Sequence, residues 1–226
     1  MPGQMIEFPS NGHSTPGYFA RPGGGKGPGV LVIQEWWGLV DHIKDLVDRF
    51  AKQGFTALAP DLYHGEKAKS PDAAGKMLMA LNIAQAGKDL RGAAQYLLGS
   101  GAVSSAKVGA VGFCMGGQLA LFAACEHPDL VGAAVDFYGI HPNVKLNVDR
   151  LGGPVLCHFG RRDKSVSEPD ARALQKRIEG AGKKAEVHFY DAGHAFFNDT
   201  RPEVYAPEAA KLAWERTLAF LRTSLK

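Results

Sequence analysis

The chain has 226 residues, of which 45% are hydrophobic and 22% charged, and its formal net charge is only +3. This balance is typical of a folded globular domain and excludes a disordered or fibrous chain. The small net charge, with no long run of Lys or Arg, argues against nucleic acid or an anionic membrane as a partner. We expect one domain over residues 1–226, with a small molecule as its partner.

The cysteines and the N-terminus point to a reducing compartment. Cys114, Cys125 and Cys157 are odd in number and lack C-x-x-C spacing, so neither a disulfide framework nor a cysteine metal site is expected. No His, Asp or Glu spacing suggests a metal site either. The first residues lack a basic patch followed by a long apolar run, and no apolar stretch approaches about 18 residues. We therefore expect a cytoplasmic protein without cofactor, metal or membrane segment.

The first half of the chain alternates between predicted strands and helices. Residues 4–8 and 14–20 predict two short strands around an Asn-Gly turn, typical of an antiparallel edge. The continuous β-branched run at 29–34 predicts a central strand buried on both faces. Residues 41–53 have a helical apolar period that ends at Gly54.

The same alternation continues to the end of the chain. A strand at 55–59 stops at Pro60, a polar loop covers 61–75, and helical stretches run from 73 to 98. Further strands are predicted at 107–111, 131–138, 154–159 and 185–190, and further helices at 168–181 and 207–225. This order predicts an α/β fold with a mostly parallel sheet of about eight strands and helices on both faces.

The strongest motif is Gly112-Phe113-Cys114-Met115-Gly116, where a strand changes to a helix within three residues. G-x-C-x-G is a variant of the nucleophile elbow of the α/β-hydrolase fold, in which a strained turn exposes the nucleophile and small flanking residues avoid clashes. The following helix favours a thiolate at Cys114. The alternative is a glycine-rich turn around an inert, buried cysteine.

Asp163 and His194 follow Cys114 in the chain order that this fold requires of the acid and the base. Each comes directly after a predicted strand, where open α/β sheets place their sites. His194 would take the thiol proton, and Asp163 would orient the imidazole. Asp191 and Asp136 are rival acids, although Asp191 lies so close to His194 that turn formation is its expected role. His158 and His188 fall inside predicted strands and are expected to be packed or surface residues.

Glu35 ends the buried strand at 29–34, so its carboxylate is expected to project into the same site. The backbone amides of Trp36 and Met115 are the expected donors to an oxyanion. A purely structural carboxylate held by loop amides is the alternative for Glu35. Trp36 and Trp37 could equally form the pocket wall.

Together these motifs resemble the dienelactone hydrolases (carboxymethylenebutenolidases) nearly end to end. The matching segments are 34–38, 59–63, 112–117, the turn at Asp163, 193–196 and 212–217. The resemblance implies a monomeric cytoplasmic hydrolase that opens the lactone ring of dienelactone to give maleylacetate. It also implies that Glu35 contacts the resting thiol until substrate releases the thiol to the histidine.

The chain departs from the family in the arginines that hold a substrate carboxylate. Residues 61–90 contain no arginine, and the position four past His194 is Asn198. The nearby cations are Lys67, Lys69, Lys76 and Arg201. Lysine does not reproduce the bidentate hydrogen bonding of arginine to a carboxylate. The candidate substrate-binding residues are Trp37, Tyr63, His64, Phe113, Phe196, Asn198 and Arg201.

Three hypotheses follow. The first is hydrolysis of a small lactone or enol ester through an acyl-enzyme on Cys114, with Asp163 and His194 completing the triad. The second is a broad carboxylesterase or thioesterase acting on small activated esters. The third is a non-catalytic relative that binds a ligand or senses oxidants through Cys114.

Overall fold

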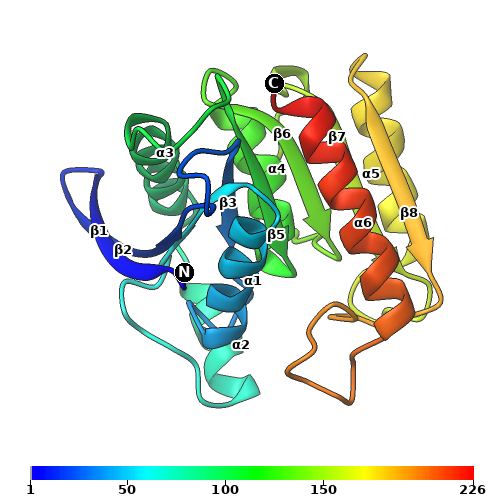
Figure 1. Cartoon of the computed structure of the whole chain (residues 1–226). Helices are drawn as coiled ribbons and strands as arrows, with labels where there is room; N and C mark the ends of the chain where they lie inside the picture. Colours follow the sequence, from blue (N-terminus) through cyan, green and yellow to red (C-terminus); the bar gives the residue numbers. More distant parts are fainter. Residues whose placement is uncertain (1) are drawn as a thin grey trace.

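The computed structural model describes residues 2–226 and shows one eight-stranded sheet at the centre of the molecule (Figure 1). The strand order is β1-β2-β4-β3-β5-β6-β7-β8; β1 and β2 pair antiparallel at one edge, β2 pairs antiparallel with β4, and all later pairs are parallel. The strands are β1 Gln4–Ser10, β2 His13–Ala20, β3 Gly29–Ile33, β4 Thr56–Pro60, β5 Val108–Phe113, β6 Val131–Phe137, β7 Val155–Gly160 and β8 Ala185–Tyr190.

Helices cover both faces of the sheet (Figure 1). Helices α1 (Asp41–Lys52) and α6 (Pro207–Ser224) pack on one face, and α3 (Ile83–Gly99), α4 (Met115–Glu126) and α5 (Glu168–Gly180) pack on the other. Helix α2 (Pro71–Ala80) lies between β4 and α3 in the chain. The prediction of an α/β fold with about eight strands is confirmed.

The two cores of the protein lie on opposite faces of this sheet. Along β3, Val30 and Val32 belong to the core under α1 and α6, whereas Leu31 and Ile33 belong to the core under α3, α4 and α5. Successive side chains of a strand point to opposite faces, so a strand buried on both sides must be apolar throughout. The continuous apolar run in the sequence therefore marked a central strand correctly.

The largest difference from the sequence prediction concerns the start of α2. A loop was expected as far as residue 75, but the helix begins at Pro71 because Ser70 caps it, with Oγ accepting from the amide of Ala73 at 3.2 Å. Asn82 caps α3 in the same way, so the predicted helical stretches are the two helices α2 and α3. Pro60 is the last residue of β4 instead of lying beyond it, since a strand end tolerates a residue without an amide hydrogen.

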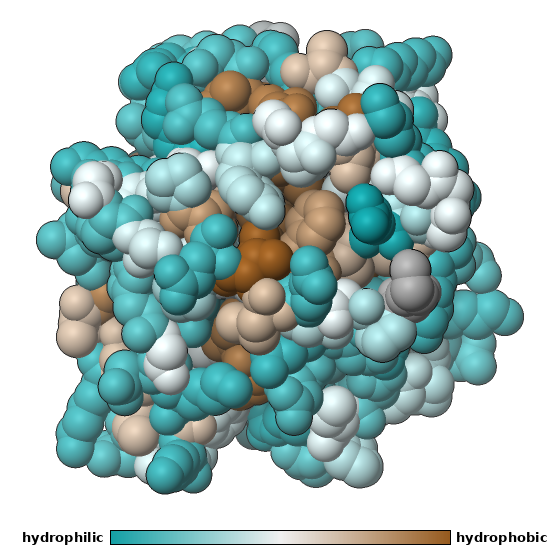
Figure 2. Space-filling model, turned by 60° about the vertical axis from the view of Figure 1, so that its left-hand side comes forward, coloured by the Kyte–Doolittle hydropathy of each residue, from teal (hydrophilic) through white to brown (hydrophobic). Residues whose placement is uncertain are grey.

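The surface is mostly polar. On the face drawn in Figure 2, hydrophilic side chains surround a smaller central group of hydrophobic ones. Met5, Met79 and Leu212 are large exposed hydrophobic side chains, and they lie on three different elements. Such isolated side chains are common on protein surfaces. Among residues 2–226, no helix has the length and apolar character that crossing a membrane requires.

Candidate active site

Cys114 lies on a sharp turn between β5 and α4. Its backbone has φ 54° and ψ −120°, a conformation that residues with a side chain rarely adopt. Its amide donates to the carbonyl of Phe137 on the neighbouring strand β6 at 2.9 Å, which holds the turn against the sheet. The side chain is half-buried. This is the geometry of a nucleophile elbow, with the thiol presented at the carboxyl end of a central strand.

The glycines around Cys114 are required by close backbone approach. A Cβ atom on Gly112 would lie 1.8 Å from the carbonyl oxygen of Gly116, and one on Gly116 would lie 2.4 Å from the carbonyl oxygen of Ile33. Neither space admits a side chain without moving the backbone of β3 or α4. The two glycines of the G-x-C-x-G pattern are therefore required because the backbones of β3, β5 and α4 meet at this turn.

His194 is paired with Asp163. Nδ1 of His194 lies 2.7 Å from Oδ2 of Asp163, whose side chain is fully buried. Oδ1 of the same carboxylate accepts from the amides of Ser165 at 2.7 Å and Val166 at 3.1 Å. The carboxylate is thus fixed by its own loop and directs one oxygen at the imidazole, an arrangement that sets the tautomer of a catalytic histidine.

The two rival acids lie elsewhere. The Asp191 side chain is 82% exposed and pairs with Arg162 at 3.1 Å. Asp136 is buried beside the elbow, where Oδ1 accepts from the amide of Gly139 at 2.8 Å, and burial raises the pKa of Asp136 well above its ordinary value. Of the three acids, Asp163 is the one hydrogen-bonded to His194.

The electrostatics of His194 favour a positive imidazole. Burial alone lowers its pKa, but hydrogen bonding with Asp163 and Cys114 and the negative charges of both groups outweigh burial and raise the pKa of His194 from 6.5 to about 10. Asp163 and Cys114 are therefore the two partners that favour the protonated imidazole.

Glu35 follows β3 and is 2% exposed. Its Oε2 accepts from Nδ2 of Asn198 at 3.0 Å, while Oε1 is buried and has no hydrogen-bond partner. Burial raises the pKa of Glu35, although the hydrogen bond from Asn198 and the charges of His194 and Arg201 oppose the rise. Cys114 thus contributes to the raised pKa of His194, whereas Asn198 is the hydrogen-bond donor to Glu35.

These groups surround one cavity of about 330 Å³. Glu35, Cys114 and His194 share its wall with the side chains of Trp36 and Trp37, whose rings meet edge to face at 5.3 Å. Met115 and Ala195, the chain neighbours of Cys114 and His194, also line the wall. A concave site of this size, with mostly apolar walls and a few polar groups, suits a small organic molecule.

Arg201 also lines the cavity, with its guanidinium 5.8 Å from the centre of the Trp37 ring. It pairs with Glu203 at 2.8 Å, and both side chains are well exposed. Lys67 and Lys69 are exposed on the loop before α2, and Lys76 pairs with Asp72 on the surface. Arg201 is thus the member of this group of cations that reaches the cavity.

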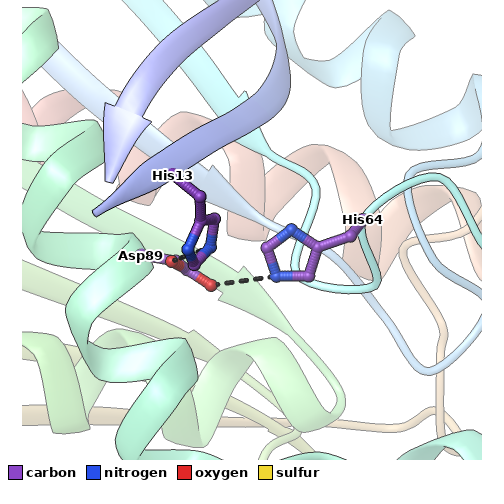
Figure 3. Close-up of side chains that lie close together, drawn as sticks. All are labelled: His13, His64 and Asp89. Carbon is purple, nitrogen blue, oxygen red and sulfur yellow. Dashed lines mark ion pairs between the residues drawn. The ribbon is translucent and has the colours of Figure 1, made fainter. Parts of the chain in front are cut away.

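Five of the candidate substrate-binding residues lie outside the cavity wall. Phe113 and Phe196 are completely buried in the core under α1 and α6. Tyr63 lies behind Met115, with Oη 3.6 Å from its sulfur. Asn198 supports Glu35 from a buried position, and His64 points away from the cavity toward Asp89 on α3, 3.1 Å distant (Figure 3).

Sequence reasoning missed several residues of the wall. Tyr138 is the most prominent, since its ring meets His194 edge to face at 5.1 Å and its hydroxyl is buried without a hydrogen-bond partner. The signal for it was available, because Tyr138 directly follows β6 at the same edge as the other site residues. The remaining wall residues that were missed are Leu78, Ile140, His141, Pro142, Ser165 and Val166.

A mostly parallel eight-stranded sheet whose elbow cysteine faces a histidine–aspartate pair defines the α/β-hydrolase fold. Comparison with known proteins then places the chain within this class. Residues 15–225 match the model of the dienelactone hydrolase family. The chain therefore belongs to the dienelactone hydrolase family and is a hydrolase acting on esters.

Individual relatives agree over almost the whole chain. "Protein usf" from Aquifex pyrophilus is 37% identical over 230 residues, covering 99% of both chains. "Putative carboxymethylenebutenolidase" from Aquifex aeolicus is 35% identical over 231 residues, covering 99% of this chain and 100% of the relative. The crystal structure titled "Putative Dienelactone Hydrolase" from Klebsiella pneumoniae superposes with a TM-score of 0.87 at 32% identity, covering 97% of this chain and 98% of that one.

Proposed function

We propose that the protein hydrolyses a small lactone or activated ester through an acyl-enzyme on Cys114. The observation that carries the proposal is the position of His194 between a fixed carboxylate and the elbow thiol, with its pKa raised to about 10 by both. A thiolate held beside an imidazolium is ready to attack a carbonyl carbon without a separate deprotonation step.

Acylation begins when the thiolate of Cys114 bonds to the carbonyl carbon and the carbonyl oxygen becomes negative. The amides of Trp36 and Met115 donate to that oxygen; Met115 starts α4, and the first amides of a helix have no acceptor within it. The carbon–oxygen bond of the ester then breaks, and His194 gives its proton to the leaving oxygen. In a lactone the leaving oxygen stays attached, so the ring opens.

In deacylation His194 acts as the base, having acted as the acid in acylation. Water attacks the thioester while His194 takes one of its protons, the carbon–sulfur bond breaks, and the acid leaves with the thiolate restored beside the imidazolium. Asp163 keeps the imidazole oriented through both halves of the reaction. Glu35 offers its unpaired Oε1 as the alternative partner of the thiol in the resting enzyme.

For the substrate we propose a flat, unsaturated lactone that carries a carboxylate. The name of the Aquifex aeolicus relative describes such a molecule, a butenolide with a carboxymethylene group. Trp36 and Trp37 offer aromatic faces to a planar ring, and Arg201 offers a guanidinium to the carboxylate. The pair that Arg201 forms with Glu203 is exposed, and exposed pairs are weak enough to be exchanged for a substrate.

A broad esterase is the second candidate, and the same Arg201–Glu203 pair favours it. If the guanidinium stays with Glu203, the remaining wall is apolar and accepts neutral activated esters equally well. Rates on dienelactone and on p-nitrophenyl acetate, measured side by side, separate the two. A large preference for the neutral ester would replace the first substrate assignment with the second.

The test of the chemistry is Cys114→Ala, which should abolish turnover of both substrates and leave the circular dichroism spectrum unchanged. The matched control is Cys125→Ala, because burial raises the pKa of Cys125 to about 11 and keeps that thiol protonated. Mass spectrometry of the wild-type protein after rapid acid quench should show the acyl group on Cys114. Full activity of Cys114→Ala, or an acyl group elsewhere, would refute the mechanism.

A further inference from the structure

Three side chains with metal-binding atoms converge on the side of the sheet where β1 and β2 lie (Figure 3). His13 begins β2, His64 lies in the loop after β4, and Asp89 is on α3. The imidazole nitrogens and a carboxylate oxygen all lie within 4.8 Å of one another. Nε2 of His64 is 3.1 Å from Oδ2 of Asp89, and Nε2 of His13 is 3.9 Å from Oδ1. We refer to these three residues as the His13 cluster.

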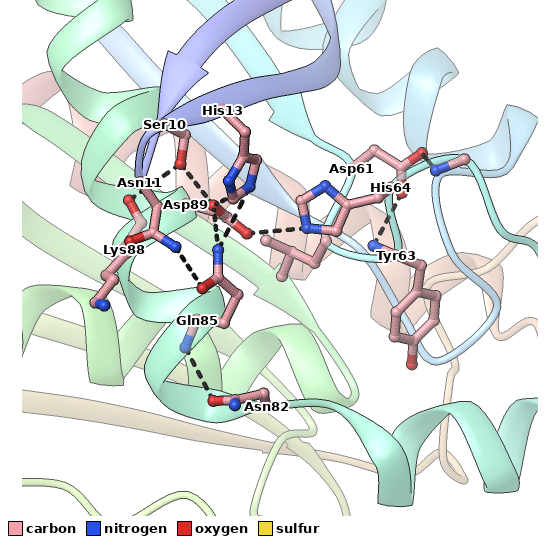
Figure 4. Close-up of polar contacts among 12 residues, drawn as sticks. Ser10, Asn11, His13, Asp61, Tyr63, His64, Asn82, Gln85, Lys88 and Asp89 are labelled. Carbon is pink, nitrogen blue, oxygen red and sulfur yellow. Dashed lines mark hydrogen bonds and ion pairs between the residues drawn. The ribbon is translucent and has the colours of Figure 1, made fainter.

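The carboxylate of the His13 cluster is buried and held in place. The side chain of Asp89 is 1% exposed, and Oδ1 accepts from Oγ of Ser10 at 2.5 Å and from Nε2 of Gln85 at 3.2 Å (Figure 4). Oδ2 is buried, makes no well-aligned hydrogen bond, and faces His64. Fixing one oxygen through polar neighbours while the other stays available is how proteins orient a carboxylate ligand.

The two imidazoles cover this buried oxygen from the solvent side. The side chains of His13 and His64 are 45% and 38% exposed, and their rings meet edge to face at 5.5 Å. Two imidazolium charges at this separation would repel each other, whereas two neutral imidazoles can bind one cation together with the carboxylate. The exposed positions also leave room for water as a further ligand.

We propose that His13, His64 and Asp89 form a binding site for a divalent transition metal ion of the zinc class. Two imidazole nitrogens and one carboxylate oxygen suit zinc and its neighbours in the first transition row, while magnesium and calcium prefer oxygen ligands throughout. Ligand atoms around a tetrahedral zinc ion lie about 3.3 Å apart, given bond lengths of about 2.0–2.1 Å. The separation of 3.1 Å between Nε2 of His64 and the available Oδ2 already matches. His13 offers a nitrogen within 4.8 Å of the other two ligand atoms, and rotation of its exposed ring would bring that nitrogen closer.

The ion would join three segments that are distant in the chain: the hairpin of β1 and β2, the loop after β4, and α3. No member of the His13 cluster lines the cavity of about 330 Å³. Tyr63 links the two places, because it precedes His64 and contacts the sulfur of Met115 on the cavity wall. The site therefore has a structural role, stabilising the hairpin edge of the fold without supplying a group to hydrolysis.

The test measures zinc binding directly. Cys114 and His194 also offer a thiol and an imidazole, so the parent protein for the titration is Cys114→Ala, stripped of metal with a chelator. Calorimetric titration with zinc chloride should show one ion per chain. Zinc at a hundredfold excess over its dissociation constant should raise the melting temperature by roughly 5–10 °C. Magnesium chloride at the same concentration should show no binding in the calorimeter and should leave the melting temperature unchanged.

His13→Gln and His64→Gln, each in the Cys114→Ala parent, should weaken zinc binding at least tenfold. The matched control is His188→Gln in the same parent, because His188 is a partly buried histidine on β8, at the opposite edge of the sheet from the hairpin of the His13 cluster. It should bind zinc like the parent. Melting temperatures without zinc check that each variant is folded. Absence of saturable zinc binding in the parent, or unchanged affinity in both cluster variants, would overturn the proposal.

Discussion

Nδ2 of Asn198 donates a 3.0 Å hydrogen bond to Oε2 of Glu35, and both side chains are almost completely buried. The two residues are 163 positions apart in the chain, so this contact ties the loop after β8 to the end of β3. It satisfies one carboxylate oxygen of Glu35 and leaves the other without a partner. A buried carboxylate that is half satisfied lowers stability whenever it is ionised.

Glu35→Gln should therefore stabilise the protein. Because burial raises the pKa of Glu35 in the folded state, ionisation destabilises the fold above that pKa. At pH 8 the variant should gain about 1–3 kcal/mol in the free energy of unfolding. The gain should vanish below the ordinary value of 4.5, where Glu35 is protonated in both states. Urea unfolding at pH 8 and below pH 4.5 measures the difference in the free energy of unfolding, with Glu66→Gln, a change of an exposed carboxylate, as the control. A loss of stability at pH 8 would contradict the prediction.

Asp163→Asn should reduce kcat by roughly 10³–10⁴-fold, because an amide in this place favours the wrong tautomer of His194. Asp191→Asn provides the matched control: that carboxylate is in the loop before His194 but is exposed and paired with Arg162. It should keep nearly full activity. Steady-state kinetics on p-nitrophenyl acetate compare the two, and equal losses in both variants would mean that Asp163 has no special role.

Arg201→Gln tests how the substrate is held. Loss of a charge-assisted contact with a carboxylate should raise KM for dienelactone roughly 10–100-fold. The kcat/KM for the neutral p-nitrophenyl acetate should change less than about threefold, because this substrate has no carboxylate for the guanidinium to bind. Arg162→Gln, which alters an arginine outside the cavity, is the control. Equal effects on both substrates would show that Arg201 supports the fold of the wall and does not select the carboxylate.

The raised pKa of His194 predicts a stability that depends on pH. The folded protein binds the imidazole proton up to about pH 10, while the unfolded chain releases it near 6.5. This contribution is complete below about pH 6.5 and is lost progressively as the pH rises to about 10. The free energy of unfolding of the wild type should fall across this window more steeply than that of His194→Gln. Parallel curves for the two proteins would show that His194 adds no stability through its proton.

The sequence predicted the parts of the fold that depend on local pattern. Continuous apolar runs marked the parallel strands, and the glycines around Cys114 marked a turn at which backbone segments touch. Helix starts were harder, because the capping role of Ser70 is a single hydrogen bond that composition does not reveal. Asp163 was favoured over Asp191 because Asp191 is so close to His194 in the chain that turn formation was its expected role. Of these two acids, Asp163 is buried against His194, and Asp191 is exposed and paired with Arg162.

Residues whose position depends on distant packing could not be inferred from motifs. His64 stands next to a family motif, yet its left-handed backbone, with φ 51°, turns it toward α3. The His13 cluster has no sequence signature, since its members come from positions 13, 64 and 89 and meet only through the strand order β1-β2-β4 and the packing of α3. Tyr138 enters the cavity wall because β6 lies beside β5 in the sheet.

The order of the strands along the chain also sets when the residues of the proposed triad come together during synthesis. Cys114 follows β5, but Asp163 follows β7 and His194 follows β8, next to the edge that is made last. A ribosome-bound chain that has emerged only as far as β7 carries the cysteine without its histidine. The proposed triad is thus completed only when the final strand and the loop after it have been made, and a half-made chain carries Cys114 without the base that would activate it.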